Sequence, residues 1–222
     1  MTTAIIVAAG KSTRMGAGTD KAFLSLGSKP VLAWSLLAFE RCPDVDRIVL
    51  VVRKDQQLAA KAVTRMFGIS KLQAIVPGGN RRQDSVMAGL DACDLDTRYV
   101  LVHDGARPCI TPAVISDVIK LVKRVPAVAV GRRMTDTVKR VEKGITVVET
   151  VDRDTLWTVQ TPQAFQIKVL CDAYKALGKT DVTDDCQAVE LAGGQVKICE
   201  TNIPNIKITT AEDLQIAGAL LK

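Results

Sequence analysis

Aromatic residues make up only 4% of this 222-residue sequence, and it contains one histidine, His103. The shortage of aromatic rings argues against the stacking platforms that bind single-stranded nucleic acid. A single histidine excludes a histidine-rich metal centre. No run of lysine and arginine exceeds two residues, so the net charge of +6 does not come from a basic tail. A small acidic substrate explains this charge as well as nucleic acid would, and we expect no nucleic-acid partner.

Long apolar runs and paired cysteines are also missing. No apolar stretch approaches the roughly 20 residues that a membrane-spanning helix needs, and Met1-Thr2-Thr3 leads directly into a strand-like run without the pattern of a signal peptide. The six cysteines show no Cys-x-x-Cys spacing and read as small buried residues of a reducing compartment. We therefore expect a cytoplasmic protein that does not contact membranes.

The sequence does contain a regular alternation of strand-like and helix-like segments. The predicted strands cover residues 4–7, 47–52, 72–76, 99–102, 127–130 and 196–199. The predicted helices cover residues 30–41, 55–67, 81–93, 112–123, 167–177 and 183–192, with a last helix capped by Thr210. This alternation predicts a single α/β domain over residues 1–222, with a Rossmann-like, mostly parallel twisted sheet flanked by helices.

The alternation breaks after Gly131. Residues 137–141 and 145–149 alternate apolar and polar side chains around Glu142-Lys143-Gly144, which predicts a β-hairpin. We expect it to form a projecting arm over about residues 135–155. Because an isolated hairpin is marginally stable in water, it should dock on something. The pattern leaves open whether that is a partner subunit or its own domain.

The most informative stretch follows the first predicted strand. It reads Ala8-Ala9-Gly10-Lys11-Ser12-Thr13-Arg14-Met15-Gly16, with Lys21 a few residues further on. It is not a Walker A loop, because Ile5 stands where that motif needs glycine, and Ser12 breaks the Rossmann fingerprint. Small residues and clustered cations are suited to holding a polyphosphate, so we favour an anion site over a plain turn with solvated cations.

Two further unusual stretches follow the third and fourth predicted strands. They are Pro77-Gly78-Gly79-Asn80-Arg81-Arg82-Gln83-Asp84-Ser85 and His103-Asp104-Gly105-Ala106-Arg107-Pro108. Since ligands of open α/β sheets bind beyond the carboxyl ends of the strands, all three stretches should meet at one edge.

Some of these residues have two interpretations. Asp104 either caps a loop or binds a divalent cation or a sugar hydroxyl. We expect Arg81 and Arg82 to be a solvated pair at a helix start, and His103 to be a packed residue rather than a catalyst.

At the level of whole motifs, the chain resembles the 2-C-methyl-D-erythritol 4-phosphate cytidylyltransferase family. The resemblance rests on the glycine loop, on the two later strand-end stretches, and on four further segments spread over the chain. Those segments are Asp136-Thr137-Val138-Lys139, residues 151–163 from Val151-Asp152-Arg153 to Gln160-Thr161-Pro162-Gln163, Thr183-Asp184-Asp185, and Asn205-Ile206-Lys207-Ile208-Thr209.

The resemblance implies substrates and residue roles. It implies CTP and methylerythritol phosphate as substrates, Mg²⁺ bound with the CTP phosphates, and a homodimer built through the arm. The CTP-binding residues would be Ala8, Ala9, Gly10, Lys11, Gly16, Gly78, Gly79, Ser85, Ala106 and Arg107. The polyol phosphate would be bound by Thr137, Arg153, Thr161 and Thr183. The catalytic residues would be Arg14, Lys21, Lys207 and Asp104, with Asp104 also a direct or water-mediated Mg²⁺ ligand.

Two rival functions remain at this point. A ribitol-5-phosphate cytidylyltransferase shares the glycine loop and the Asp-x-Ala-Arg element, although the acceptor-side segments favour methylerythritol phosphate. A non-catalytic nucleotide-binding regulator would bind CTP without releasing pyrophosphate.

Overall fold

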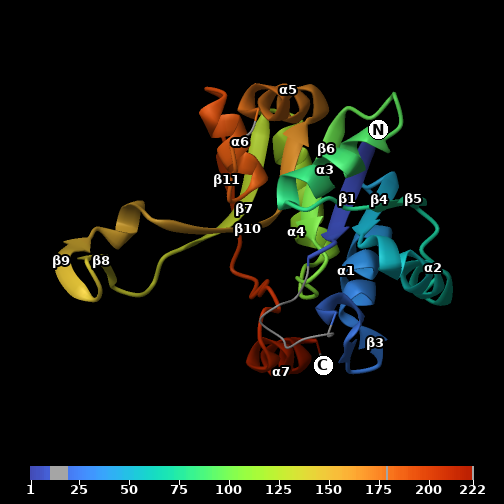
Figure 1. Ribbon diagram of the computed structural model, residues 1–222, viewed down its shortest axis with the longest axis horizontal. Coiled ribbons are helices and arrows are strands. Elements are labelled where there is room, and N and C mark those ends of the chain that lie inside the picture. Colours follow the sequence, from blue (N-terminus) through green and yellow to red (C-terminus); the bar gives the residue numbers. More distant parts are fainter. Residues whose placement is uncertain (11–19, 179, 222) are drawn as a thin grey trace.

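The computed structural model describes residues 1–10, 20–178 and 180–221, and its centre is a sheet of seven strands (Figure 1). The order across the sheet is β11-β7-β10-β6-β1-β4-β5. The strand bounds are β1 (Thr2–Ala8), β4 (Arg47–Val52), β5 (Leu72–Pro77), β6 (Tyr99–Asp104), β7 (Ala127–Arg133), β10 (Trp157–Gln166) and β11 (Lys197–Glu200). All six predicted strands are present, so the predicted α/β sheet is confirmed.

One strand of the sheet, β10, was not predicted. It runs antiparallel to both of its neighbours, β6 and β7, whereas the other neighbouring strands are parallel. Its pairing with β7 is interrupted between Gln160 and Gln163, where a bulge shifts the register. The sheet is therefore mostly parallel, as expected, with a single reversed strand next to the strand that ends at Asp104.

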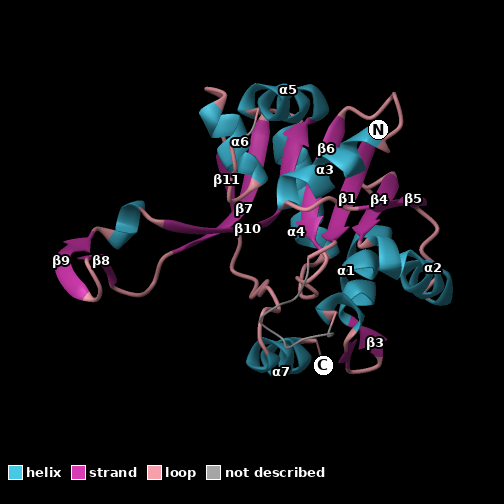
Figure 2. Ribbon diagram, viewed as in Figure 1, coloured by secondary structure: helices cyan, strands magenta, loops and turns pink. Residues whose placement is uncertain are grey.

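Helices cover both faces of the sheet (Figure 2). One apolar core contains α1 (Val31–Glu40), α2 (Gln57–Met66) and α4 (Pro112–Val122). The opposite core contains α3 (Arg82–Asp91), α5 (Ile167–Leu177) and α6 (Asp185–Leu191). The two cores separate because alternate strand residues point to opposite faces: Ile6 belongs to the first core and Ile5 to the second. The predicted doubly wound arrangement is thus confirmed.

A smaller layer lies beyond the carboxyl ends of the strands. It contains α7 (Ala211–Leu220) and a short unpredicted hairpin of β2 (Ser25–Leu26) and β3 (Lys29–Pro30). Its apolar core is built on Leu26, Val31, Ile208 and Ala217. The 3-10 turn η2 (Lys21–Phe23) enters this layer, and η3 (Lys54–Gln56) precedes α2.

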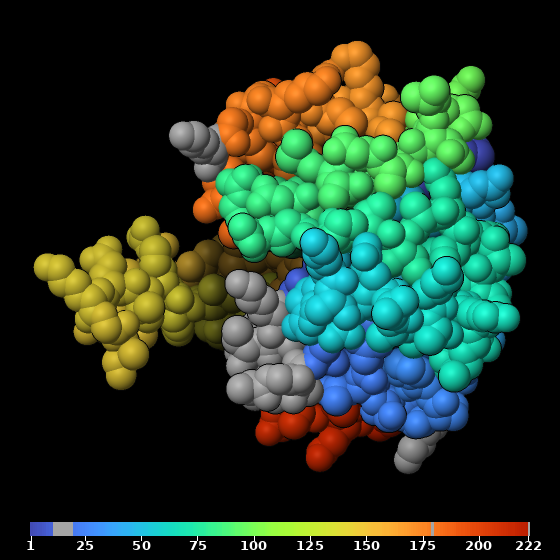
Figure 3. Space-filling view, turned by 45° about the vertical axis from the view of Figure 1, so that its right-hand side comes forward, coloured from blue at the N-terminus to red at the C-terminus, as the bar shows by residue number. Residues whose placement is uncertain are grey.

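The predicted hairpin is confirmed as β8 (Val138–Glu142) and β9 (Thr146–Val151), followed by the 3-10 turn η4 (Arg153–Thr155). Within the described residues, β8 and β9 pair with each other and with no other strand. Together they form an arm that stands clear of the body (Figures 1 and 3). Four of its apolar side chains, Val141, Ile145, Val147 and Val148, are exposed, from 46% at Val148 to 93% at Ile145.

Across the described part of the chain, no helix has the length and apolar character required to cross a bilayer.

Candidate active site

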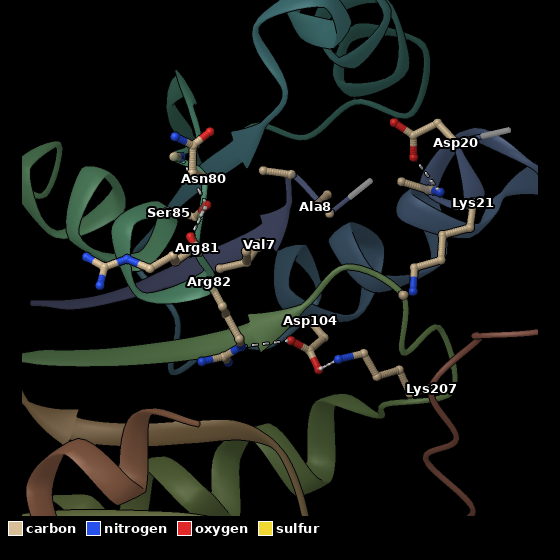
Figure 4. Close-up of a pocket in the computed structure, with 15 residues that line it drawn as sticks. Val7, Ala8, Asp20, Lys21, Asn80, Arg81, Arg82, Ser85, Asp104 and Lys207 are labelled. Atoms are coloured by element: carbon tan, nitrogen blue, oxygen red, sulfur yellow. Dashed lines mark hydrogen bonds and ion pairs between the residues drawn. The ribbon is translucent and has the colours of Figure 1, made fainter. Parts of the chain in front are cut away.

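The described parts of the three stretches singled out in the sequence, with residues 8–10 for the first, do meet at one edge of the sheet. They surround a cavity of about 260 Å³ that is lined by residues 7–10, 20–22 and 79–82 together with Ser85, Asp104, Ala106 and Lys207 (Figure 4). The ends of β1, β5 and β6 supply most of this lining, since these strands are parallel and end at the same edge. Lys207 reaches the cavity from the loop between β11 and α7.

The turn after β5 brings backbone close to the end of β1. A Cβ atom on Gly78 would lie 2.4 Å from the Cβ of Ala9 and 2.8 Å from Oγ of Ser85. The amide of Gly79 donates to Oγ of Ser85 at 3.1 Å, and that hydroxyl donates to the carbonyl of Arg81 at 3.2 Å. Ser85 therefore fixes the shape of this turn, while glycine leaves backbone groups accessible to a flat ligand.

Asp104, the last residue of β6, is surrounded by three cationic side chains. Its Oδ2 lies 2.9 Å from Nζ of Lys207 and 3.4 Å from Nε of Arg107. Its Oδ1 lies 3.6 Å from Nε of Arg82. Burial opposes the charged carboxylate, but Lys207, Arg82 and Arg107 outweigh it and hold the pKa of Asp104 well below its ordinary value. Asp104 is therefore ionised at neutral pH.

Arg82 is not the solvated residue that we expected. It lies in an ion pair with the fully buried Asp185, with Nη1 2.7 Å from Oδ2. The Tyr174 hydroxyl donates to the other oxygen of Asp185. Burial opposes charge on Arg82, yet Asp185 and Asp104 raise its pKa above the ordinary value. The expectation was wrong because the first turn of α3 directs Arg82 inward.

The other half of the pair, Arg81, does behave as expected. Its side chain is 42% exposed and pairs with Asp84 at 2.6 Å and with Asp181 at 3.0 Å.

Behind Asp104, a chain of hydrogen bonds fixes the backbone. The amide of Asp104 donates to Oγ1 of Thr161 at 3.0 Å. Because the carbonyl of Arg107 can only accept, Nε2 of the neutral His103 carries the proton and donates to it at 3.2 Å, and Nδ1 therefore accepts from the Thr161 hydroxyl at 3.1 Å. Burial lowers the pKa of His103 to about 4. His103 is a packed, neutral residue, as predicted, and Thr161 supports Asp104 from inside the protein.

The loop that carries Lys207 is anchored to the same strand ends. The side-chain amide of Asn205 donates to the carbonyl of Thr161 at 2.7 Å, and Nη1 of Arg107 donates to the carbonyl of Asn205 at 2.9 Å. The amide of Ile208 donates to the carbonyl of Ala106 at 2.8 Å. Lys207 is thus flanked by two fixed points, which determines where its amine can reach.

Lys21 lies on the opposite wall from Arg82, where η2 begins (Figure 4). Oδ1 of Asp20 accepts the amide of Ala22 at 3.1 Å and caps this turn. Oδ2 of Asp20 lies 3.6 Å from Nη2 of Arg53. The remaining predicted loop residues, Lys11, Arg14 and Gly16, lie outside the described residues.

The predicted polyol-phosphate residues are spread over a wide area. Thr137 and Arg153 belong to the arm, where both side chains are exposed and Nη1 of Arg153 donates to the carbonyl of Thr135 at 2.7 Å. Thr183 is exposed before α6 and donates to Oε1 of Gln187 at 3.0 Å. Within one subunit, these residues do not share the cavity wall that Asp104 and Lys207 form.

The arrangement is suited to an anionic ligand that carries a flat base. Backbone from the β1 and β5 ends forms one wall, and Lys21, Arg82 and Lys207 supply positive charge. Sequence reasoning missed Asp20, Arg82, Asp185 and Asn205. The signal available for Asp20 was its position directly before Lys21, and for Asn205 its position in the segment that carries Lys207.

Comparison with known proteins gives a consistent result. Residues 2–222 match the IspD family, described as 2-C-methyl-D-erythritol 4-phosphate cytidylyltransferase. A protein of that name from Desulforamulus reducens is 42% identical over 222 residues, which cover 99% of this chain and 95% of the relative. One from Dehalococcoides mccartyi is 44% identical over 219 residues, covering 99% and 95%. The crystal structure of 4-diphosphocytidyl-2C-methyl-D-erythritol synthase from Anaerococcus prevotii is similar with a TM-score of 0.89 at 33% identity, over 100% of this chain and 96% of that one.

Proposed function

Because this chain belongs to the 2-C-methyl-D-erythritol 4-phosphate cytidylyltransferase family, we propose that the cavity at the strand ends is the site of its reaction. The enzyme transfers CMP from CTP to 2-C-methyl-D-erythritol 4-phosphate, giving 4-diphosphocytidyl-2-C-methyl-D-erythritol and pyrophosphate, a step of isoprenoid biosynthesis. We propose that the enzyme acts in the cytoplasm, where CTP is available. The family membership confirms the resemblance and disfavours the ribitol phosphate enzyme and the regulator.

One observation carries the assignment of the site. The ends of β1, β5 and β6 and the Lys207 loop surround the same cavity, so backbone donors, Asp104 and two lysines face one ligand volume. We assign the triphosphate to Ala8–Gly10 with Lys11, Gly16 and Arg14. We assign the cytosine to Gly78, Gly79 and Ser85, and the ribose and phosphates to Asp104, Ala106 and Arg107.

The chemistry needs little proton transfer, because the acceptor phosphate is already an anionic nucleophile. Its oxygen attacks the α-phosphorus in line, a P–O bond forms, and the bond to the bridging oxygen of the leaving pyrophosphate breaks. The barrier comes from repulsion between anions and from charge that develops on pyrophosphate. Lys21 and Arg14 stabilise the α-phosphate, and Lys207 aligns and neutralises the attacking phosphate.

The residues present fit a divalent cation that arrives with the nucleotide. Mg²⁺ is usually held by one or two carboxylates together with substrate phosphates and water. In the part of the chain that the structure describes, the ion pair of Oδ1 of Asp104 is the one with Arg82 at 3.6 Å, which leaves room for a direct or water-mediated contact. Among the described residues there is no group of three acidic, histidine or cysteine side chains that would form a protein-only cage. We propose Mg²⁺, which when bound neutralises the phosphates of CTP, with Asp104 as its protein ligand.

A homodimer through the arm completes the acceptor side of this proposal. The exposed apolar residues of β8 and β9 need cover, and Thr137 and Arg153 lie far from their own cavity on this arm. We propose that the arm packs on a second copy and delivers Arg153 to the partner's acceptor site. Thr183 lies next to α6 on the body and would contact the acceptor within its own subunit.

The test is pyrophosphate release from CTP and Mg²⁺ with methylerythritol phosphate, in parallel with ribitol 5-phosphate and with ATP, GTP or UTP replacing CTP. Release with CTP and methylerythritol phosphate alone is the expected result. Preferential release with ribitol 5-phosphate would overturn the acceptor assignment. CTP binding without release from either acceptor would indicate a regulator.

A further inference from the structure

Asp185, the first residue of α6, is a completely buried carboxylate behind the cavity, 0% exposed. Tyr174 donates its hydroxyl to Oδ1, and Arg82 approaches Oδ2 to 2.7 Å. Burial raises the pKa of Asp185 above its ordinary value, and the charge of Arg82 and the Tyr174 hydroxyl act in the opposite direction, so the carboxylate depends on these two partners. None of the roles assigned above uses this residue, so its contacts call for an explanation.

Arg82 lies between two carboxylates and is closer to Asp185. Its Nη1 is 2.7 Å from Asp185, whereas its Nε is 3.6 Å from Oδ1 of Asp104. The second distance is beyond that of a hydrogen bond. Since the guanidinium is planar and rigid, the tight contact with Asp185 limits how closely Nε can approach Asp104. Asp185 therefore determines the position of a cavity-lining cation without lining the cavity itself.

The two oxygens of Asp104 are used unequally. Lys207 and Arg107 both approach Oδ2, at 2.9 Å and 3.4 Å, whereas Arg82 is the ion-pair partner of Oδ1 among the residues that the structure describes. If Asp185 were replaced by a neutral residue, Asp104 would be the carboxylate that remains paired with Arg82 among the described residues. The guanidinium would then move onto Oδ1.

We propose that Asp185 is a positioning residue for cytidylyl transfer, which holds Arg82 away from Oδ1 of Asp104 so that this oxygen stays available to the groups arriving with CTP. The inference rests on the proposed function of the cavity. It also explains the contact between the starts of α3 and α6. Asp185, two positions after Thr183, would then determine the arrangement of charged groups on the nucleotide side of the site.

The first test compares Asp185→Asn with Asp181→Asn. Asp181 forms a similar ion pair with the neighbouring Arg81, at 3.0 Å, but its side chain is 77% exposed and lies outside this cluster. Asp185→Asn should lower kcat/KM for CTP by about tenfold or more, since displacements of about 1 Å at a reaction centre have effects of this size. Asp181→Asn should stay within about twofold of the wild type. Equal kinetics in the two variants would overturn the proposal.

A second comparison separates positioning from support of the fold. Tyr174→Phe removes one donor to Asp185 and leaves its contact with Arg82 in place, so it should lower Tm while leaving the KM for CTP unchanged. A crystal structure of Asp185→Asn should show Nε of Arg82 within about 3 Å of Oδ1 of Asp104. If activity in both variants falls in proportion to the loss of Tm, or if Arg82 does not move, the role is structural and the proposal is wrong.

The double variant Asp185→Asn/Arg82→Gln covers the case in which Asp185→Asn fails to fold. It removes both charges, and its kcat/KM for CTP should equal that of Arg82→Gln alone, because Asp185 acts through Arg82. A further loss in the double variant relative to Arg82→Gln would contradict the proposal. Absence of pyrophosphate release from the wild-type enzyme would refute the proposed function instead, while the position of Arg82 in the variant crystal would still test this inference.

Discussion

Nζ of Lys207 lies 2.9 Å from Oδ2 of Asp104. The amine that we propose binds the attacking phosphate is therefore paired with the carboxylate at the end of β6. A phosphate entering the cavity must share or replace this contact. Because Asp104 is itself anchored by Thr161 through its backbone amide, the carboxylate is a fixed reference point for the amine. The arrangement keeps Lys207 in place before the substrates arrive.

Lys207→Ala should reduce kcat by about 10²–10³, the cost typical of losing one group that stabilises transition-state charge. The fold should persist, because the side chain of Lys207 is 38% exposed and its loop is anchored through Asn205 and Ile208. Pyrophosphate release at saturating substrates measures the effect. Lys168→Ala is the matched control, since that lysine is 86% exposed and pairs with Asp172 on the surface of α5. Normal turnover in Lys207→Ala would remove this residue from the mechanism.

Gly78→Ala should raise the KM for CTP by about tenfold and lower the free energy of unfolding by about 1–3 kcal/mol. The added methyl would lie 2.4 Å from Cβ of Ala9, so the turn after β5 and the end of β1 must separate. Steady-state kinetics and chemical denaturation check the two effects. Gly218→Ala in α7 serves as control, because its Cβ would meet only Leu26 at an ordinary 3.5 Å. A Gly78→Ala enzyme with unchanged KM for CTP would contradict the cytosine assignment.

The arm offers a test of subunit association. Val141 and Val147 are cross-strand neighbours that are 48% and 54% exposed, and replacing both by aspartate should shift the protein to a monomer, since buried unpaired charges oppose association. Analytical ultracentrifugation measures the change, with Leu95→Asp on the body as control for an exposed leucine. An unaltered association state would show that the arm is not the interface.

Arg153→Ala tests whether the arm contributes to the neighbouring site. Alone, this variant should lose activity, because Arg153 is assigned to the acceptor phosphate of the partner. Mixed with Lys207→Ala under conditions of subunit exchange, it should regain about a quarter of the wild-type activity. About half of the dimers are then mixed, and in each mixed dimer one of the two sites receives both intact residues. Failure of complementation after verified exchange would place Arg153 in its own subunit's site or in neither.

His103 gives the stability of the protein a defined pH dependence. Burial lowers its pKa to about 4 in the folded state, below the ordinary value of about 6.5, so the unfolded chain binds more protons between these values. The contribution is fully present above about pH 6.5 and is lost as the pH falls towards 4, by about 3 kcal/mol at most. Urea denaturation at several pH values checks this. His103→Gln should flatten the dependence between pH 6.5 and 5, where the chain has no other histidine to titrate.

The apolar runs sufficed to predict the strands whose side chains are all buried, such as Ile48–Val52 in β4. They could not predict β10, because several of its buried residues are polar. Gln163 is 1% exposed and uses its amide to hold the start of α6, and Thr161 is 4% exposed beneath Asp104. Residue type alone does not distinguish a polar side chain that is buried and hydrogen-bonded from one that is exposed to water.

The sequence predicted which segments form the site, because that follows from the order of strands and loops along the chain. It did not predict which way individual side chains point. Strand ends on a parallel sheet must meet, which located Ala9, Gly79 and Asp104 together. In the doublet Arg81-Arg82, however, one arginine faces solvent and the other faces Asp185. That difference arises from the helical rotation between successive residues and from a partner about a hundred positions away in the sequence.

The strand β10 makes the protein unequally tolerant of changes in length. Trp157 pairs with Arg133 at the root of the arm, and four residues later Thr161 holds the amide of Asp104. An insertion of one residue between Trp157 and Gln160, where the pairing with β7 is regular, would turn the inward side chains of this stretch outward. The tip at Lys143 and Gly144 carries no such constraint. Homologous chains should therefore vary in length at the tip of the arm and keep the spacing along β10 constant.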